Sequence, residues 1–266
     1  MRLAERFGST AHAISRHSRM IWALSLRELA TRYGRENLGF LWVLGEPLLF
    51  CGSVSILWSI VQSPYEHGIR IVPFVVTGYM PLLLVRHILA HGMYAVRVNA
   101  PLLYHRKISP LHLFVARSLV ELVGVTFAFI VIWLLLAPFG LMELPKHLSL
   151  VYLGWFLLAW ISFGLAMIFG ALFELFEPIE RFVQVITYLL VPLSGTFYMA
   201  AWIPPQFRGY VLLLPFINTV EMVRAGFFGE FIPTYFSISY TLCCAAGLTL
   251  LGLILVAFVR GRVIVE

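Results

Sequence analysis

The chain has 266 residues, of which 61% are hydrophobic and only 12% are charged. A soluble domain carries about 25% charged residues, so this composition excludes an ordinary soluble domain and indicates a membrane protein. The formal net charge of +6 does not indicate nucleic-acid binding, because the basic residues gather in alternate loops, as they do on the cytoplasmic side of membrane proteins.

The first 37 residues are basic and hold seven arginines. Residues 1–19 are predicted to form a loose cytoplasmic tail. Residues 20–35 are predicted to form an amphipathic helix that lies in the membrane interface, because large apolar residues recur there at helical spacing. A soluble packing helix is the alternative interpretation. The apolar face would carry Trp22, Leu26, Leu29 and Tyr33.

Six apolar segments follow, each long enough to cross about 30 Å of hydrocarbon at 1.5 Å per residue. An even number of spans places both termini in the cytoplasm together with the basic segment 94–110. Residues 201–236 are apolar but broken by prolines, so they are predicted to form short re-entrant helices between the last two spans. The six predicted spans are 38–61, 71–93, 111–137, 150–173, 182–200 and 237–259.

The first span contains an ionisable residue, Glu46, directly before Pro47. An ionisable group inside a membrane span is a functional candidate by default. Proline should kink the helix, because it lacks a backbone N–H. The alternative is that Glu46 only caps or pairs locally to hold the kink.

Four further polar residues fall within the spans. Arg117 and Glu121 lie four positions apart in the third span and are predicted to form an intrahelical ion pair. His87 and His91 have the same spacing in the second span. Two histidines without a third ligand are a weak metal signal, so polar packing is expected and no metal site is predicted.

The loop from residue 94 to 112 is basic, yet it holds large hydrophobic residues that a solvated loop would not need. This combination predicts docking of a partner protein. The acidic loop 174–181 is a possible second docking point, with an ordinary interfacial turn as the alternative. The hydrophobic residues of the first loop are Leu102, Leu103, Tyr104 and Ile108.

An aromatic stripe would run along one face of the fifth span if its helix continued past Pro192. Aromatic rings with polar tips suit a passage for sugars, although ordinary helix packing explains the stripe equally well. Neither of the two lysines follows a glycine, so this chain has no Gly-rich phosphate loop and any ATP must be bound by another polypeptide. The stripe consists of Tyr188, Val191, Gly195, Tyr198 and Trp202.

Several segments, which together cover nearly the whole chain, resemble type-2 ABC exporter permeases for polysaccharides and polyol phosphates. The most specific is Leu26-Arg27-Glu28-Leu29-Ala30-Thr31-Arg32-Tyr33, followed by Leu38-Gly39-Phe40-Leu41-Trp42 and Glu46-Pro47. Looser matches are Asn99 to Pro110, Phe197-Tyr198 with Pro204, Pro215-Phe216-Ile217-Asn218 and Glu221-Met222-Val223-Arg224. Pro215-Phe216 stands where many members have Asn-Pro. The length is most similar to that of the capsular polysaccharide subgroup.

The resemblance implies an all-α integral membrane protein, with a tail and gate helix in residues 1–37 and a six-span domain in residues 38–266. It implies a homodimer joined to two ATP-binding subunits that bind ATP and magnesium, while this chain binds no cofactor and is not an enzyme. The substrate would be a lipid-linked polysaccharide at the bacterial inner membrane. A periplasmic adaptor and an outer-membrane export protein would be further partners. The rival functions are an ion-coupled transporter, using Glu46 or Glu121, and a membrane-embedded glycan-modifying enzyme.

The resemblance also implies roles for four groups of residues. The substrate canal would be lined by Trp42, Glu46, Phe50, Trp58, Tyr188, Phe197, Tyr198 and Trp202. The gate helix would use Trp22, Arg27, Arg32 and Arg35. Coupling to the ATPase would involve Asn99, Leu102, Leu103, Tyr104, Arg106, Lys107, Pro110 and Glu177. The periplasmic gate would contain Pro204, Pro215, Asn218, Glu221 and Arg224.

Overall fold

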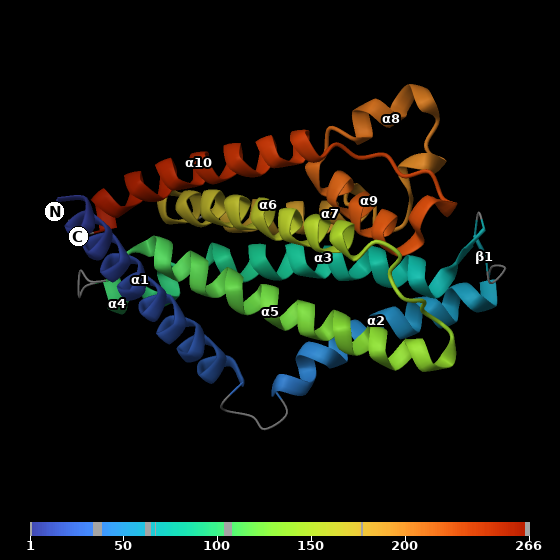
Figure 1. The fold of residues 1–266 in the computed structure, drawn as a ribbon, viewed down its shortest axis with the longest axis horizontal. Coiled ribbons are helices and arrows are strands. Elements are labelled where there is room, and N and C mark those ends of the chain that lie inside the picture. Colours follow the sequence, from blue (N-terminus) through green and yellow to red (C-terminus); the bar gives the residue numbers. More distant parts are fainter. Residues whose placement is uncertain are drawn as a thin grey trace.

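The computed structural model describes residues 2–33, 39–61, 65–66, 68–103, 108–176 and 178–263. The described chain is almost entirely helical, and most of its long helices lie side by side along one direction (Figure 1). Helix α1 begins and helix α10 ends at the same end of this bundle, which we call the terminal end. The opposite end, the loop end, carries a short hairpin and helix α8. The prediction of an all-α fold is confirmed.

The long helices are α1 (Arg2–Tyr33), α2 (Gly39–Val61), α3 (Ile71–Met93), α5 (Pro110–Leu136), α6 (Leu148–Leu175), α7 (Ile179–Leu193), α9 (Pro215–Phe228) and α10 (Ile238–Val263). Shorter helices are α4 (Ala100–Leu103) and α8 (Pro205–Val211), with 3₁₀ turns η1 (Arg97–Asn99), η2 (Ala137–Phe139), η3 (Ala200–Trp202) and η4 (Gly229–Phe231). Strands β1 (Tyr65–Glu66) and β2 (Ile69–Arg70) form a minimal antiparallel hairpin.

Four stretches of the described chain are long and apolar enough to cross a membrane, namely Ile71–Met93, Pro110–Phe139, Leu148–Leu175 and Ile238–Val259. A fifth would be the pair α8 and α9, which is bent by 108° at its break. Helices also occur at the predicted first span, in α2, and at the start of the predicted fifth span, in α7.

Helix α1 is longer than predicted, because it runs from Arg2 to Tyr33 as one helix of 32 residues. The prediction of a loose tail over residues 1–19 was therefore wrong. That segment is rich in alanine and arginine, which are good helix formers, and the first proline of the chain is Pro47. Polar composition indicates exposure to water, but it does not prevent a helix.

Helix α7 is shorter than predicted and ends at Leu193. Pro192 has no N–H to continue the helical ladder, and Gly195 adopts a left-handed backbone with φ of 77°. Tyr198 and Trp202 therefore lie beyond the helix, and the predicted stripe does not form one helical face. Residues 194–200 instead make a buried turn between α7 and η3.

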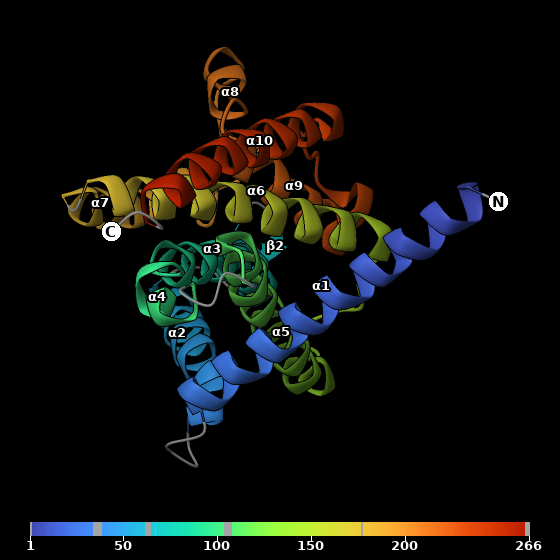
Figure 2. The same cartoon turned by 90° about the vertical axis from the view of Figure 1, so that its left-hand side faces the viewer.

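The helices form two layers, which are seen end-on in Figure 2. One layer holds α2, α3 and α5, and the other holds α6, α7, α9 and α10, with α1 crossing the terminal end diagonally. Helix α3 is the most enclosed of the four apolar stretches, and α6 packs against α3, α9 and α10. Helices α6 and α10 approach closely at Gly164 and Gly252, where an added Cβ would come within 3.0 Å of Leu248 and 2.8 Å of Met167.

Candidate functional site at the crossing of α1, α3 and α5

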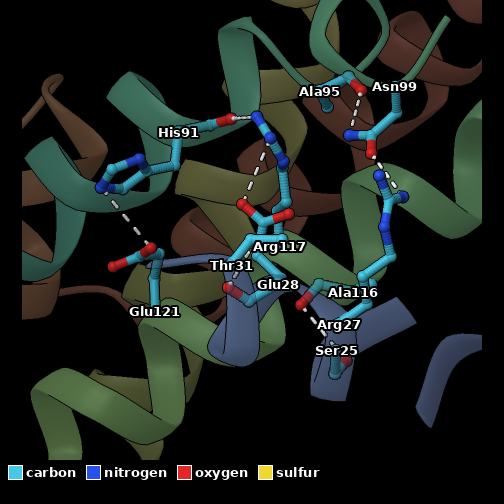
Figure 3. A network of polar contacts seen from close by, with 10 residues as sticks. All are labelled: Ser25, Arg27, Glu28, Thr31, His91, Ala95, Asn99, Ala116, Arg117 and Glu121. Carbon is cyan, nitrogen blue, oxygen red and sulfur yellow. Dashed lines mark hydrogen bonds and ion pairs between the residues drawn. The ribbon is translucent and has the colours of Figure 1, made fainter. Parts of the chain in front are cut away.

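Helix α1 touches the beginning of α5 through polar side chains (Figure 3). The Ser25 hydroxyl donates to the carbonyl oxygen of Ala116 at 3.4 Å. Farther towards the N-terminus, the rings of His17 and His112 stack, with Nδ1 of His17 2.7 Å from Nε2 of His112. The apolar face predicted for this helix stays exposed at Trp22, Leu26 and Leu29. A polar face against the protein and an apolar face outside it fit a helix that lies in a membrane interface.

Arg117 of α5 connects three helices at this crossing. Its Nη2 atom lies 3.2 Å from Oε1 of Glu28 on α1, and its Nη1 atom donates to the carbonyl oxygen of His91 on α3 at 2.8 Å. The sequence had predicted an intrahelical pair with Glu121, whereas these partners of Arg117 come from other helices. Both Arg117 and Glu28 are largely buried, so each charge depends on its partner.

A second link joins α1 to the segment that follows α3. Arg27 donates from Nη1 to Oδ1 of Asn99 at 3.1 Å, and Nδ2 of Asn99 donates to the carbonyl oxygen of Ala95 at 3.0 Å. Asn99 is buried, although it belongs to a short 3₁₀ turn at the end of the bundle. Two residues predicted for different roles, the gate helix and the coupling loop, are thus in direct contact.

The predicted coupling loop has an apolar interior of its own. Leu102 and Leu103 are half-buried and pack against the cluster that contains Val96 and Phe114. Packing inside the subunit therefore accounts for part of the apolar character that predicted a docking partner. The neighbouring Val98, which the sequence analysis missed, is 61% exposed. Its exposure depends on which side of η1 it occupies, and the amino-acid pattern does not show this.

The start of α5 and the start of α7 both border this loop. Pro110 is the first residue of α5, and the Ser109 and His112 side chains cap the helix reciprocally.

The hydroxyl of Tyr94 donates to Glu180 at 2.6 Å. Burial, together with this carboxylate, raises the pKa of Tyr94 to about 12, so the hydroxyl keeps its proton and the bond persists at neutral pH. The acidic loop before α7 is thereby attached to the end of α3.

A cluster of two carboxylates and two histidines lies deeper along the same helices. Nδ1 of His87 lies 3.2 Å from Glu121, and Nε2 of the same ring lies 3.7 Å from Glu46. Nε2 of His91 lies 3.6 Å from the other oxygen of Glu121. The cluster joins α2, α3 and α5, so the ionisable residues that the sequence singled out separately belong to one site. Among the described residues, no group of three or more histidine, cysteine, aspartate or glutamate side chains is arranged to hold a metal ion.

The predicted periplasmic gate residues lie at the loop end and form hydrogen bonds that hold several loops. Arg224 is fully buried and donates to the carbonyl oxygens of Gly195, Thr196 and Tyr198 at 2.6 to 2.7 Å. Its guanidinium also lies 4.3 Å from the centre of the Phe74 ring. These bonds replace the helical ladder that ends with α7.

Two further side chains of α9 extend this arrangement. Glu221 accepts hydrogen bonds from the backbone N–H groups of Ala200 and Tyr235, and Asn218 accepts one from Ser237. Residues 218, 221 and 224 recur every three positions and so share one side of the helix. Pro204 lies directly before α8, and Pro215 is the first residue of α9.

The predicted canal residues are spread over several elements. Glu46 and Phe50 lie on α2, and the Phe50 ring stacks on Tyr79 with centroids 3.8 Å apart. Tyr188 is 73% exposed on α7. Phe197 and Tyr198 belong to the turn after α7. Trp202 lies in η3, and its ring packs against that of Phe74 on α3.

Some of the predicted residues lie outside what the structure describes. These are Arg35, Tyr104, Arg106, Lys107 and Glu177, together with the side chains of Arg32, Trp42 and Trp58.

Residues 19–228 match the family of ABC-2 type transporters. This match runs from the middle of α1 to the end of α9, and it includes Glu28 and Arg117 at the crossing and Arg224 at the loop end. The chain therefore belongs to the ABC-2 type transporter family, and the resemblance inferred from the sequence is confirmed at the level of the family.

Individual relatives share nearly the whole length of the chain. It is 36% identical over 244 residues to the capsule polysaccharide export inner-membrane protein CtrC of Neisseria meningitidis serogroup B, covering 91% of this chain and 92% of CtrC. It is 33% identical over 238 residues to the capsule polysaccharide export inner-membrane protein BexB of Haemophilus influenzae, covering 90% of each. It is 26% identical over 219 residues to the polysialic acid transport protein KpsM of Escherichia coli, covering 82% of this chain and 84% of KpsM.

Proposed function

We propose that this chain is the permease subunit of an ABC exporter that moves a lipid-linked capsular polysaccharide across the bacterial inner membrane. The observation that carries the proposal is the similarity to CtrC over 91% of the chain. The permease acts as a homodimer with two ATP-binding subunits, which supply ATP and magnesium. The polymer then passes to a periplasmic adaptor and an outer-membrane export protein.

In this proposal the subunit crosses the membrane six times, through α2, α3, α5, α6, α7 and α10. Helix α1 begins and α10 ends at the same end of the bundle, which supports an even number of spans (Figure 1). The excess of arginine in the first 37 residues places this end in the cytoplasm in the proposal. Helix α7 has only 15 residues, about 22 Å at 1.5 Å per residue. The turn that extends it is buried, and its carbonyl groups are bonded by Arg224, as non-helical backbone at membrane depth requires. The bent pair α8 and α9 forms the re-entrant gate within residues 201–236.

The movement of the ATPases reaches the membrane domain through residues 97–110. The exposed Val98 side chain contributes to the surface that meets the ATP-binding subunit. The same coupling role is proposed, from the sequence, for Tyr104, Arg106, Lys107 and Glu177, which lie outside the described residues. The hydrogen bond from Arg27 to Asn99 supports a direct path to the gate helix α1. Binding of ATP shifts this segment, α1 follows, and the canal between the two copies opens.

Helices α2 and α7 line the canal in this proposal. The partly exposed Glu46 and the exposed Tyr188 offer a carboxylate and an aromatic ring to a sugar chain, one for hydroxyl groups and the other for apolar sugar faces. Glu46 at membrane depth also favours an aqueous surface over a lipid-facing one.

The test is deletion of the encoding gene in a capsulated host. Polymer should disappear from the surface and accumulate inside the cell, and a plasmid copy should restore export. Purification of a tagged copy in mild detergent should bring down an ATP-binding subunit. Normal surface polymer in the deletion strain would overturn the proposal.

The Glu46–His87–Glu121 cluster favours one alternative, an ion-coupled transporter, because carboxylate and histidine pairs can carry protons. The two functions differ in their energy source. Export from inverted vesicles should require ATP and continue when a protonophore collapses the pH gradient. Export that stops with the protonophore while ATP remains abundant would favour ion coupling.

A further inference from the structure

His87 lies between two carboxylates, and each of its ring nitrogens faces one of them. Nδ1 is 3.2 Å from Oε2 of Glu121 on α5, and Nε2 is 3.7 Å from Oε2 of Glu46 on α2. The Glu121 side chain is 5% exposed and that of His87 is 24% exposed. The two acids come from different helices, so His87 on α3 is the group that connects them.

The geometry decides the protonation of the ring. A neutral imidazole carries one N–H and one nitrogen lone pair, whereas an imidazolium carries an N–H on both nitrogens. In the neutral form, one lone pair would face a carboxylate oxygen, which is repulsive. In the imidazolium form both nitrogens point an N–H towards a carboxylate, and the positive charge compensates the Glu121 carboxylate, which burial would otherwise make costly.

Three other groups that can carry a positive charge lie near these two acids. Arg86 precedes His87 on α3 and lies close enough to influence Glu46. His91 contacts the second oxygen of Glu121. Arg117, one turn before Glu121 on α5, is directed to Glu28 of α1 and to the backbone of α3. His87 contacts both acids, Glu121 at 3.2 Å and Glu46 at 3.7 Å.

Glu46 lies at a point where the backbone hydrogen bonding of α2 is interrupted. Pro47 follows it within α2, and a proline inside a helix removes one backbone hydrogen bond and bends the helix. The hydrogen-bond ladder of α2 is weakened at this point, so tertiary contacts help to fix the orientation of the helix. The contact between Glu46 and His87 is one of these contacts.

We infer that His87 holds a bound proton in the folded subunit, and that the resulting imidazolium is a positioning residue that ties α2, next to Pro47, to α3 and α5. This inference rests on the proposed function only in its export test. The proton is a fixed part of the structure and is not transported.

Export measurements on the complete complex test the positioning role. His87→Gln, which keeps hydrogen bonding without the charge, should lower export at least about fivefold, within the range of coupling between contacting residues. The double variant Glu121→Gln with His87→Gln should recover much of that loss, because α5 then carries no buried carboxylate that needs this cation. His147→Gln is the matched control, since His147 is an exposed histidine at the start of α6 and should leave export unchanged. Export by His87→Gln at the wild-type rate, or no recovery in the double variant, would overturn the role.

Nuclear magnetic resonance of the complex in bilayers, with ¹⁵N-labelled histidine, tests the bound proton without any transport assay. The signal lost in His87→Gln identifies this ring. It should keep the imidazolium pattern at a pH of about 8, above the ordinary histidine pKa of about 6.5. A neutral pattern for His87 at that pH would overturn the inference. Loss of export by the wild-type complex would count against the proposed function and would leave this measurement valid.

Discussion

Arg117 and Glu28 form an ion pair at 3.2 Å between the predicted third span and the helix that precedes the first one. The same guanidinium holds the backbone of α3 at His91. One side chain therefore connects the interfacial helix α1 to two helices of the bundle (Figure 3).

Arg117→Leu should destabilise the subunit by about 3 kcal/mol or more, because it leaves the largely buried Glu28 carboxylate without its cation. Combining it with Glu28→Leu should recover part of this loss, since no unpaired charge remains. Thermal unfolding of the purified complex in detergent measures both effects. Arg16→Leu, an exposed position on α1, should leave the transition unchanged. Equal stability of Arg117→Leu and the wild type would contradict the expected dependence.

Arg27→Ala should uncouple ATP hydrolysis from export, because it removes the hydrogen bond between α1 and Asn99. We expect export to fall roughly tenfold while the ATPase subunit stays bound and hydrolyses ATP, since a hydrogen bond to a charged group is worth about 1.5–3 kcal/mol. Asn99→Ala should behave similarly, and the double variant should lose little more than either single one. Arg19→Ala on the same helix is the control. A fully additive double variant would show that the two residues act separately.

Gly78→Ala tests the packing between α3 and the turn that ends α7. An added Cβ would lie 2.3 Å from the carbonyl oxygen of Thr196 and 2.7 Å from Nη2 of Arg224, so the turn would have to move. Overpacking of this kind costs about 1–3 kcal/mol. Gly52→Ala meets no atom within 4 Å and should raise or preserve the unfolding temperature. If both variants unfold together, the turn is not held against α3 as described.

Val98→Asp should release the ATP-binding subunit without unfolding the permease, because this side chain is 61% exposed beside α4. Replacing Leu102 and Leu103 with serine should lower stability first, since both pack partly into the subunit. Co-purification reports partner binding, and fluorescence-detected size exclusion reports folding. Normal partner retention by Val98→Asp would place the contact surface elsewhere.

The sequence by itself determined the class of protein and most of the helices. A helix that crosses a bilayer must be long and apolar, so segment length and apolar composition suffice to locate it. Helix α3 occurs at residues 71–93 as predicted, and the ends of α5, α6 and α10 lie within a few residues of the predicted ones. The absence of a phosphate-binding loop indicated an energy source in another chain. Glu46, His87 and Glu121 stood out as candidates because charge is rare in such segments.

Only the tertiary structure decided which of these residues meet. Helical spacing predicted a pair of Arg117 with Glu121, but it did not predict that Arg117 contacts Glu28 of α1 or that Glu121 contacts two histidines of α3. The reason is that helical periodicity specifies neighbours along one helix, whereas the partner across a helix crossing depends on the angle and depth at which helices pack. The end of α7 shows the same limit. The apolar composition of this segment continues past Leu193 and does not show where the helix ends. The left-handed Gly195 and the hydrogen bonds from Arg224 to the backbone carbonyl groups form only when α3, α7 and α9 are assembled.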